Sequence, residues 1–160
     1  MRTILIAALI VAFAAPLSSQ DFNKGVDAYY SGDYATALKE WEPLAEQGLA
    51  QAQYNIGLMY HNGQGVPQDY KEAAKWYRRA AEQGDAKAQS NLGMMYANGQ
   101  GVLQDNVLAH MWFNLSAVNG HDRGGKNRDI IAERMTAEDI SKAQAMARKC
   151  MNSDYQDCGY

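Results

Sequence analysis

The sequence predicts an all-α fold, an α-solenoid of helix-turn-helix repeats that ends in a C-terminal capping helix. Three observations support this prediction: a gap-free internal repeat, apolar residues at helical spacing inside each copy, and the loss of the repeat pattern toward the C-terminus. The 160 residues are 47% hydrophobic and 21% charged. This composition is typical of one globular domain with a continuous core.

The first residues are expected to lie outside this fold. Arg2 precedes an unbroken apolar run over residues 4–15, and the small residues Ser18 and Ser19 follow it. A positive start, a short apolar run and small residues are together typical of a secretory signal peptide. The run is too short to cross a bilayer as a helix.

We therefore predict a signal peptide over residues 1–19 and a mature domain over residues 20–160. Cleavage is expected after Ser19, with Ala14 as the second choice. The mature protein is then periplasmic or secreted and has no stable membrane anchor. An uncleaved anchor or a buried N-terminal helix is the alternative.

The main body of the chain is a repeat. Residues 50–84 align without a gap on residues 86–120, which lie 36 positions further on. The first segment reads AQAQYNIGLMYHNGQGVPQDYKEAAKWYRRAAEQG, and the second reads AKAQSNLGMMYANGQGVLQDNVLAHMWFNLSAVNG. Roughly half of the aligned positions are identical. A fixed period in this range indicates a stacked helical array.

A third copy precedes these two and has a shorter connection. Residues 34–48 lie 36 positions ahead of residues 70–84, whereas Phe22-Asn-Lys-Gly lies only 32 positions ahead of Tyr54-Asn-Ile-Gly. The loop of the first copy is therefore four residues tighter. We predict repeats over approximately residues 21–48, 49–84 and 85–120, followed by a cap over residues 121–160.

Each copy is expected to form two antiparallel helices. An apolar stripe at four-residue spacing, made by Ala52, Ile56 and Tyr60, predicts the first helix. Gly63-Gln-Gly65 interrupts that helix. Asp69 is the expected N-cap of the second helix, and Glu72 would complete a capping box. Gly84 is expected to end the second helix, and Asp85 to cap the next.

Small residues are expected to bring the helices close together, with aromatic side chains filling the remaining space. Beyond Gly120 the pattern decays, so we expect a short half-helix over residues 127–135 and a longer helix capped by Thr136. Its apolar face is expected to contain Ile140, Ala143, Ala147 and Cys150. A solenoid needs such an atypical last unit because its final interface has no neighbour.

Both cysteines, Cys150 and Cys158, lie near the C-terminus. An even number of cysteines in an exported chain favours a disulfide, and the intervening segment is long enough to turn back. We predict that this bridge pins the tail. Two free or intermolecular thiols are the alternative.

The strings NIGLMYHNGQGVPQDYKEAAKWYRRAAEQG and NLGMMYANGQGVLQD resemble the Sel-one-like repeat, a branch of the tetratricopeptide superfamily. The resemblance covers residues 22–120, and RMTAEDISKAQAMARK resembles the terminal helix of exported bacterial members. It implies a right-handed superhelix, an adaptor role and residence in the periplasm. It implies no particular partner.

Motifs for chemistry are scarce. The histidines His61, His110 and His121 have no zinc-like spacing, and the Gly-Gln-Gly turns lack the sequence of a phosphate loop. No S-x-x-K or G-x-S-x-G occurs. We expect no metal, no cofactor and no catalytic residue. The formal net charge of -3, with scattered lysines and arginines, makes nucleic acid an unexpected partner.

Helical geometry predicts a binding groove instead. Tyr54 and Leu58 point away from the core stripe of their helix, and their repeat equivalents include Phe22, Val26 and Met94. Asn23, Asn55 and Asn91 recur beside this line. In arrays of the resembled type the first helices line the concave face, which would place the asparagines next to an apolar strip. A role for these asparagines in fixing the stacking of the repeats is the alternative.

The predicted function is therefore a non-catalytic periplasmic adaptor for a protein or peptide. A cell-envelope hydrolase of β-lactamase-like or cell-wall type, or a structural assembly protein, is the alternative. The oligomeric state does not follow from the sequence.

Overall fold

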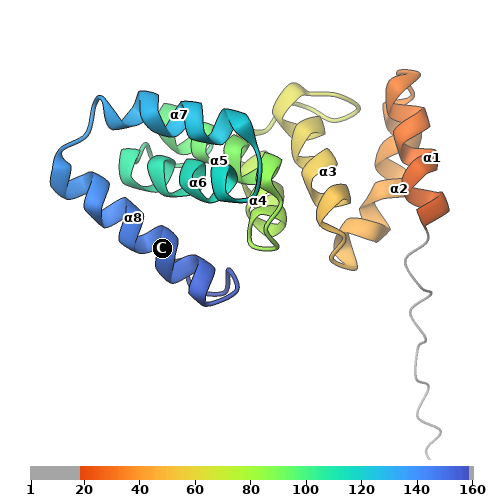
Figure 1. The fold of residues 1–160 in the computed structure, drawn as a ribbon. Coiled ribbons are helices and arrows are strands. Elements are labelled where there is room, and N and C mark those ends of the chain that lie inside the picture. Colours follow the sequence, from red (N-terminus) through yellow and green to blue (C-terminus); the bar gives the residue numbers. More distant parts are fainter. Residues whose placement is uncertain (1–18, 159–160) are drawn as a thin grey trace, which may run out of the picture.

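The computed structural model describes residues 19–158, in which every regular element is an α-helix. The helices are α1 (Ser19–Tyr30), α2 (Tyr34–Glu46), α3 (Ala50–Asn62), α4 (Tyr70–Ala81), α5 (Ala86–Asn98), α6 (Asn106–Val118), α7 (Asp122–Ala132) and α8 (Ala137–Asn152). Figure 1 shows them side by side in chain order, with α1 at one end and α8 at the other. The predicted signal peptide lies outside the described residues, apart from Ser19.

The helices pack as successive antiparallel pairs. α1 packs on α2, α3 on α4 and α5 on α6, and the pairs are joined by the contacts of α2 with α3 and of α4 with α5. The chain closes with α7 and α8, which both pack on α6. The predicted α-solenoid is confirmed. None of the helices in residues 19–158 has the length and apolar character that a membrane crossing requires.

Asp69 caps α4 as predicted. The prediction that Glu72 completes a capping box is wrong. The Asp69 carboxylate accepts hydrogen bonds from the backbone N–H groups of Lys71 at 2.8 Å and Glu72 at 3.1 Å. The Asp69 N–H already donates to the carbonyl of Tyr60 at 3.0 Å. Glu72 therefore has no donor to reach back to, and its carboxylate pairs with Lys75 instead.

The helix hairpins turn at glycines with left-handed backbone. Gly63 ends α3 with φ 69° and Gly99 ends α5 with φ 67°, a conformation that costs glycine little. After these turns, Asp69 caps α4 and Asp105 caps α6 in the same way. Asp85 caps α5, the first helix of the third pair. The equivalent turns explain why the repeat aligns without a gap.

Within each pair, a glycine of the first helix lies directly against an aromatic ring of the second. A Cβ atom added to Gly25 would lie 2.3 Å from the Trp41 ring, one added to Gly57 would lie 2.6 Å from the Tyr77 ring, and one added to Gly93 would lie 2.7 Å from the Phe113 ring. These distances are far inside van der Waals contact. Each ring is buried, so the pairs can approach this closely only because the first helix carries glycine.

The helix α7 begins earlier than the predicted half-helix over residues 127–135. It starts at Asp122 and ends at Ala132, although Gly124 and Gly125 both disfavour helix. A Cβ atom at Gly124 would lie 2.7 Å from Cβ of Ser116 on α6. The glycine therefore lets α7 pack tightly on α6, and this packing outweighs its low helix propensity.

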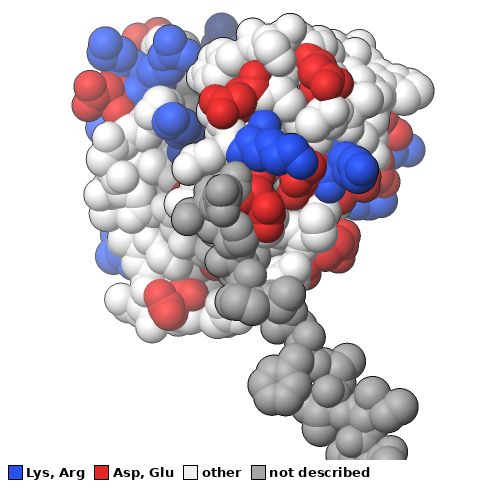
Figure 2. Space-filling view, turned by 90° about the vertical axis from the view of Figure 1, so that its right-hand side faces the viewer, with Lys and Arg blue, Asp and Glu red and all other residues white. Residues whose placement is uncertain are grey.

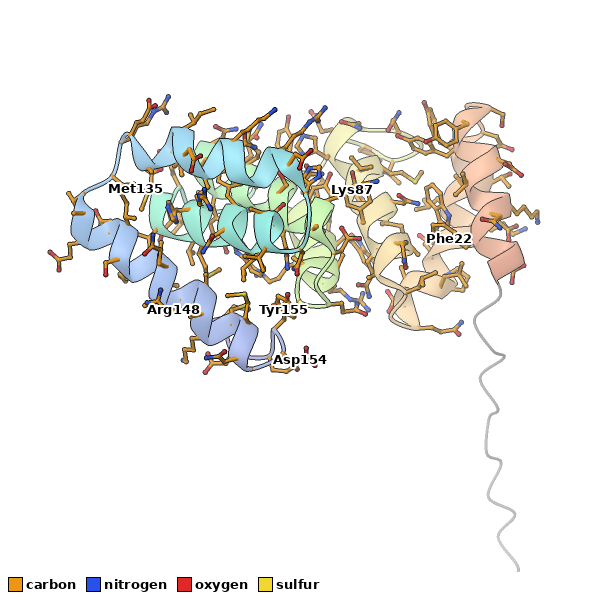
Figure 3. The ribbon with its side chains drawn as sticks, viewed as in Figure 1. Phe22, Lys87, Met135, Arg148, Asp154 and Tyr155 are labelled. Carbon is orange, nitrogen blue, oxygen red and sulfur yellow. A yellow bond between two sulfur atoms is a disulfide. The ribbon has the colours of Figure 1, made fainter. Side chains whose placement is uncertain are left out.

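The last helix ends in the predicted bridge. Cys150 and Cys158 form a disulfide that folds residues 153–158 back along the end of α8. Tyr155, in this tail, accepts a hydrogen bond at its hydroxyl from Asn119 Nδ2 at 2.9 Å. Figure 3 shows Asp154 and Tyr155 at the turn after α8. The bridge thus holds the tail against the end of α6.

The glycine–aromatic contacts lead to a prediction about stability. Gly57→Ala should lower the free energy of unfolding by about 1–3 kcal/mol, because the added methyl group overlaps the buried Tyr77 ring. The matched control is Gly125→Ala in α7, where the nearest atom to the added Cβ is 3.7 Å away. That change should stabilise the protein by about 0.5–1 kcal/mol through helix propensity. Urea denaturation of both variants tests the difference, and equal effects would contradict the packing argument.

Candidate binding groove

The first helices of the pairs line a hollow between α1 and α3 that reaches the start of α5. Its volume is about 530 Å³. Five of the residues predicted for the groove line it, namely Phe22, Val26, Tyr54, Asn55 and Leu58. Tyr29, Tyr30 and Trp41 add further aromatic surface. Tyr30 is 84% exposed, so the aromatic wall continues out to the solvent.

A second hollow, of about 600 Å³, lies between α3, α5 and α7. It contains two more predicted residues, Asn91 and Met94, and shares Tyr54 and Lys87 with the first hollow. We call the two hollows together the groove. Figure 3 shows Phe22 and Lys87 toward the two sides of α3, which the groove follows.

The predicted asparagines do not all lie in the groove. Asn55 lines the first hollow and Asn91 the second, whereas Asn23 is exposed and lines neither. Each groove asparagine faces the first helix of the preceding pair, and α1 has no such helix before it within the described residues. Asn127, 36 positions after Asn91, also lines the second hollow. Extending the 36-residue period into α7 would have identified it.

Asn91 lies next to two phenols, those of Tyr54, which lines the groove, and of the buried Tyr77. Burial raises the pKa of Tyr54 and of Tyr77, and Asn91 is close enough to both hydroxyls to lower their pKa in part. Both phenols are therefore protonated at neutral pH and can donate hydrogen bonds. The rings of Tyr54 and Tyr77 are in contact, with their centroids 5.9 Å apart.

Glutamines, which the sequence analysis did not consider, join the repeats. Gln53 is 2% exposed, and its Nε2 donates to the carbonyl of Ala45 in the preceding helix at 2.9 Å. Its Oε1 accepts a hydrogen bond from Gln83 Nε2 at 2.7 Å. Gln53 therefore connects α2, α3 and the end of α4.

The same arrangement recurs one repeat later. Gln89 is fully buried, donates to the carbonyl of Ala81 at 3.1 Å and accepts from Asn119 Nδ2 at 2.9 Å. The identity of Gln53 and Gln89 in the aligned repeats was the available signal. These contacts join α2 to α3 and α4 to α5 across the repeat boundaries.

The charges of the groove change along its length. Asp85 and Lys87 line the first hollow, whereas the second is lined by Lys87 and Arg123 and by no carboxylate. Figure 2, which views the molecule from the end formed by α1 and α2, shows acidic and basic side chains interspersed there. The second hollow therefore differs in charge from the first hollow and from this end of the molecule.

Two of the histidines, His61 and His110, are placed for packing. Burial lowers the pKa of His61 and of His110. His110 is 2% exposed, and the ring of His61 meets the ring of Tyr70 edge-on at 5.2 Å. Residues 19–158 contain no group of three or more histidine, cysteine or acidic residues arranged to hold a metal ion.

Comparison with known proteins identifies the repeat. The family model described as Sel1 repeat matches residues 50–85 and 86–121. A solved Sel1 repeat protein from Oxalobacter formigenes is similar with a TM-score of 0.64 and 35% identity, over 69% of this chain and 86% of that one.

Two further similarities cover a smaller part of the other protein. The structure of c5321, a protective antigen of uropathogenic Escherichia coli with an SLR fold, has a TM-score of 0.80 and 30% identity, over 86% of this chain and 30% of that one. DAP3-binding cell death enhancer 1 of Rattus norvegicus and of Mus musculus is 38% identical over 45 residues. This match spans 28% of the present chain and 9% of those relatives.

The separate roles of glutamine and asparagine lead to a second prediction. Gln53→Ala should lower the free energy of unfolding by about 2 kcal/mol, because it removes the buried hydrogen bonds of Gln53 with the Ala45 carbonyl and with Gln83. Asn55→Ala, two residues further along the same helix, should change it by less than about 0.5 kcal/mol. Thermal and urea denaturation measure both. If Asn55→Ala lowered the free energy of unfolding more than Gln53→Ala does, the asparagines would be the residues that fix the stacking.

Proposed function

The chain belongs to the Sel1 repeat family, and on this basis we propose that it is a non-catalytic adaptor whose groove binds an extended segment of a partner protein. Sel1 repeats typically mediate protein interactions. The mammalian relatives carry DAP3 binding in their name, which supports a protein partner for the repeat. The groove is the single observation on which the proposal depends.

The groove offers hydrogen-bond partners for the backbone of an extended peptide. Such a peptide has unpaired backbone donors and acceptors, and an asparagine amide supplies one of each. Asn55 and Asn91 lie in successive hollows along the groove, so they can contact successive parts of one peptide. The phenol of Tyr54, which lines both hollows, is a further donor between them.

Apolar side chains of the same peptide would occupy the first hollow. Phe22, Tyr29 and Tyr54 present aromatic surface there, and Leu58 adds aliphatic surface. Met94, in the second hollow, is 41% exposed. Contiguous exposed apolar surface of this kind marks interaction sites more reliably than scattered residues do. We therefore propose a peptide with at least one large apolar or aromatic side chain.

The proposal of a non-catalytic role rests on the side chains of the groove. Ser90 and His121 both line the second hollow, but no hydrogen bond joins them in the described part of the chain. An activated serine needs a base within hydrogen-bonding reach. The groove therefore has the composition of a binding surface.

We further propose that the protein is exported and acts in the periplasm or outside the cell. The apolar run over residues 4–15, with Arg2 before it and small residues after it, has the order of a signal peptide. The disulfide between Cys150 and Cys158 is compatible with an oxidising compartment.

The groove proposal can be tested with peptides selected by the mature chain from a random phage-displayed library. Asn55→Ala should weaken the affinity of the selected peptides about three- to tenfold, the effect of one lost hydrogen bond. Lys75→Ala, on the exposed face of α4, is the matched control and should bind as the unmodified chain does. Fluorescence anisotropy measures the affinities. If no peptide is selected, or if Asn55→Ala and Lys75→Ala bind alike, the groove is not the binding site.

The export proposal predicts a mature N-terminus at Gln20. Intact-mass spectrometry of the native protein from fractionated cells should find a chain that lacks residues 1–19, in the periplasmic or secreted fraction. A cytoplasmic chain that still carries residues 1–19 would refute it.

A further inference from the structure

We infer that the groove is chemically polarised and selects a peptide in which a large apolar or aromatic side chain fills the first hollow and an acidic side chain enters the second. This inference rests on the proposed function, because it specifies the peptide that the groove would bind. It is carried by the way equivalent positions change from one repeat to the next.

The aromatic surface of the groove decreases along the stack. Phe22 on α1 is followed by Tyr54 at the equivalent position on α3 and by Ser90 on α5. Phe22 and Tyr54 line the first hollow, whereas Tyr54 and Ser90 line the second. At these equivalent positions the wall of the first hollow is therefore aromatic, and the wall of the second hollow is more polar.

Positive charge increases in the same direction. Gln51 on α3 is followed at intervals of 36 residues by Lys87 on α5 and Arg123 on α7. Gln51 and Lys87 line the first hollow, and Lys87 and Arg123 line the second. Two cations thus converge on the second hollow although the whole chain has a formal net charge of -3.

No carboxylate lines the second hollow beside these cations. Within residues 19–158, Lys87 and Arg123 form no ion pair. Asp85 lines the first hollow and not the second, and its carboxylate accepts the N-cap hydrogen bond from Ala88 at 2.8 Å. Asp122 does not line the second hollow either. Charge complementarity therefore favours an acidic group from a partner.

Neutral donors surround the two cations. The amides of Asn91 and Asn127 and the hydroxyl of Ser90 line the same hollow, and each can donate to a carboxylate oxygen. The N-terminus of α7 adds to this, because its N-cap residue His121 makes no side-chain hydrogen bond to the helix and helix N-termini attract negative charge. An acidic side chain would thus find both charge and hydrogen bonds.

The two hollows are close enough for one peptide to occupy both. They share the side chains of Tyr54 and Lys87, so the apolar wall and the cations lie on adjoining parts of the surface. A peptide with an apolar side chain and an acidic side chain a few residues apart matches this order. The order also sets the direction in which the peptide lies along α1, α3, α5 and α7.

The experiment uses the mature, oxidised chain and the peptides selected from the random library. They are resynthesised with a C-terminal amide, so that every carboxylate comes from a side chain. The selected sequences should share an acidic residue at a fixed spacing from a large apolar or aromatic residue. Replacing that acidic residue by its amide should weaken binding about tenfold, an effect expected for a charge-assisted hydrogen bond.

Two variants of the protein test whether the second hollow holds the acidic residue. Lys87→Gln combined with Arg123→Gln should remove the difference in affinity between the acidic peptide and its amide counterpart, while the unfolding temperature stays unchanged. Lys142→Gln, on the exposed side of α8, is the matched control and should preserve the difference.

The outcomes separate this inference from the proposed function. Peptides that bind without any preference for an acidic residue would overturn the inference and leave the groove proposal standing. A preference that survives in the Lys87→Gln, Arg123→Gln variant, or binding that requires a free C-terminal carboxylate, would also overturn it. The absence of any binding peptide would refute the proposed function itself, and the inference with it.

Discussion

The contact between a backbone glycine and a buried aromatic ring determines the geometry of every repeat. Gly25, Gly57 and Gly93 each lie against a ring of the next helix, where a methyl group could not fit. The ring fixes how closely the two helices of a pair approach, and it differs in type from pair to pair while the glycine does not. Because all three pairs share this spacing, their first helices are placed equivalently. The continuity of the groove is a result of that equivalence.

Positions 53 and 55 show how one helix contributes both to the stack and to the surface of the groove. Residues two apart on an α-helix point about 200° apart around its axis. Gln53 consequently faces the preceding pair and is buried, whereas Asn55 reaches the groove. The buried glutamine has two hydrogen-bond partners in the scaffold. At the groove position the surroundings differ between repeats, because Asn91 lies next to the phenols of Tyr54 and Tyr77, whereas Asn55 lines the first hollow.

The sequence predicted the helices and turns that depend on interactions between residues close together in the chain. A period of 36 residues, the glycine turns and the aspartate caps were visible in residues 50–120 and led to the correct helix pairs. The start of α7 was missed, because its Gly-Gly pair disfavours helix and only packing on α6 explains it. The glutamine contacts were missed because Gln53 and Gln89 donate to backbone carbonyls of the preceding helix, and a backbone acceptor leaves no mark in the sequence. For the groove, helical geometry predicted which positions face it, but only the structure shows that Asn23 is exposed and lines neither hollow.

The tail after α8 has a consequence for assembly. A bare solenoid end is a stacking surface to which another copy could add, and head-to-tail addition that does not close into a ring produces filaments. Here Asn119, whose amide reaches Gln89 in the same repeat, also bonds with Tyr155 of the disulfide-closed tail. The C-terminal segment therefore lies along the ends of α4 and α6, while α7 and α8 cover the face of α6 on which a further helix pair would stack. The chain's own last helices thus occupy the surface through which copies could otherwise add head to tail.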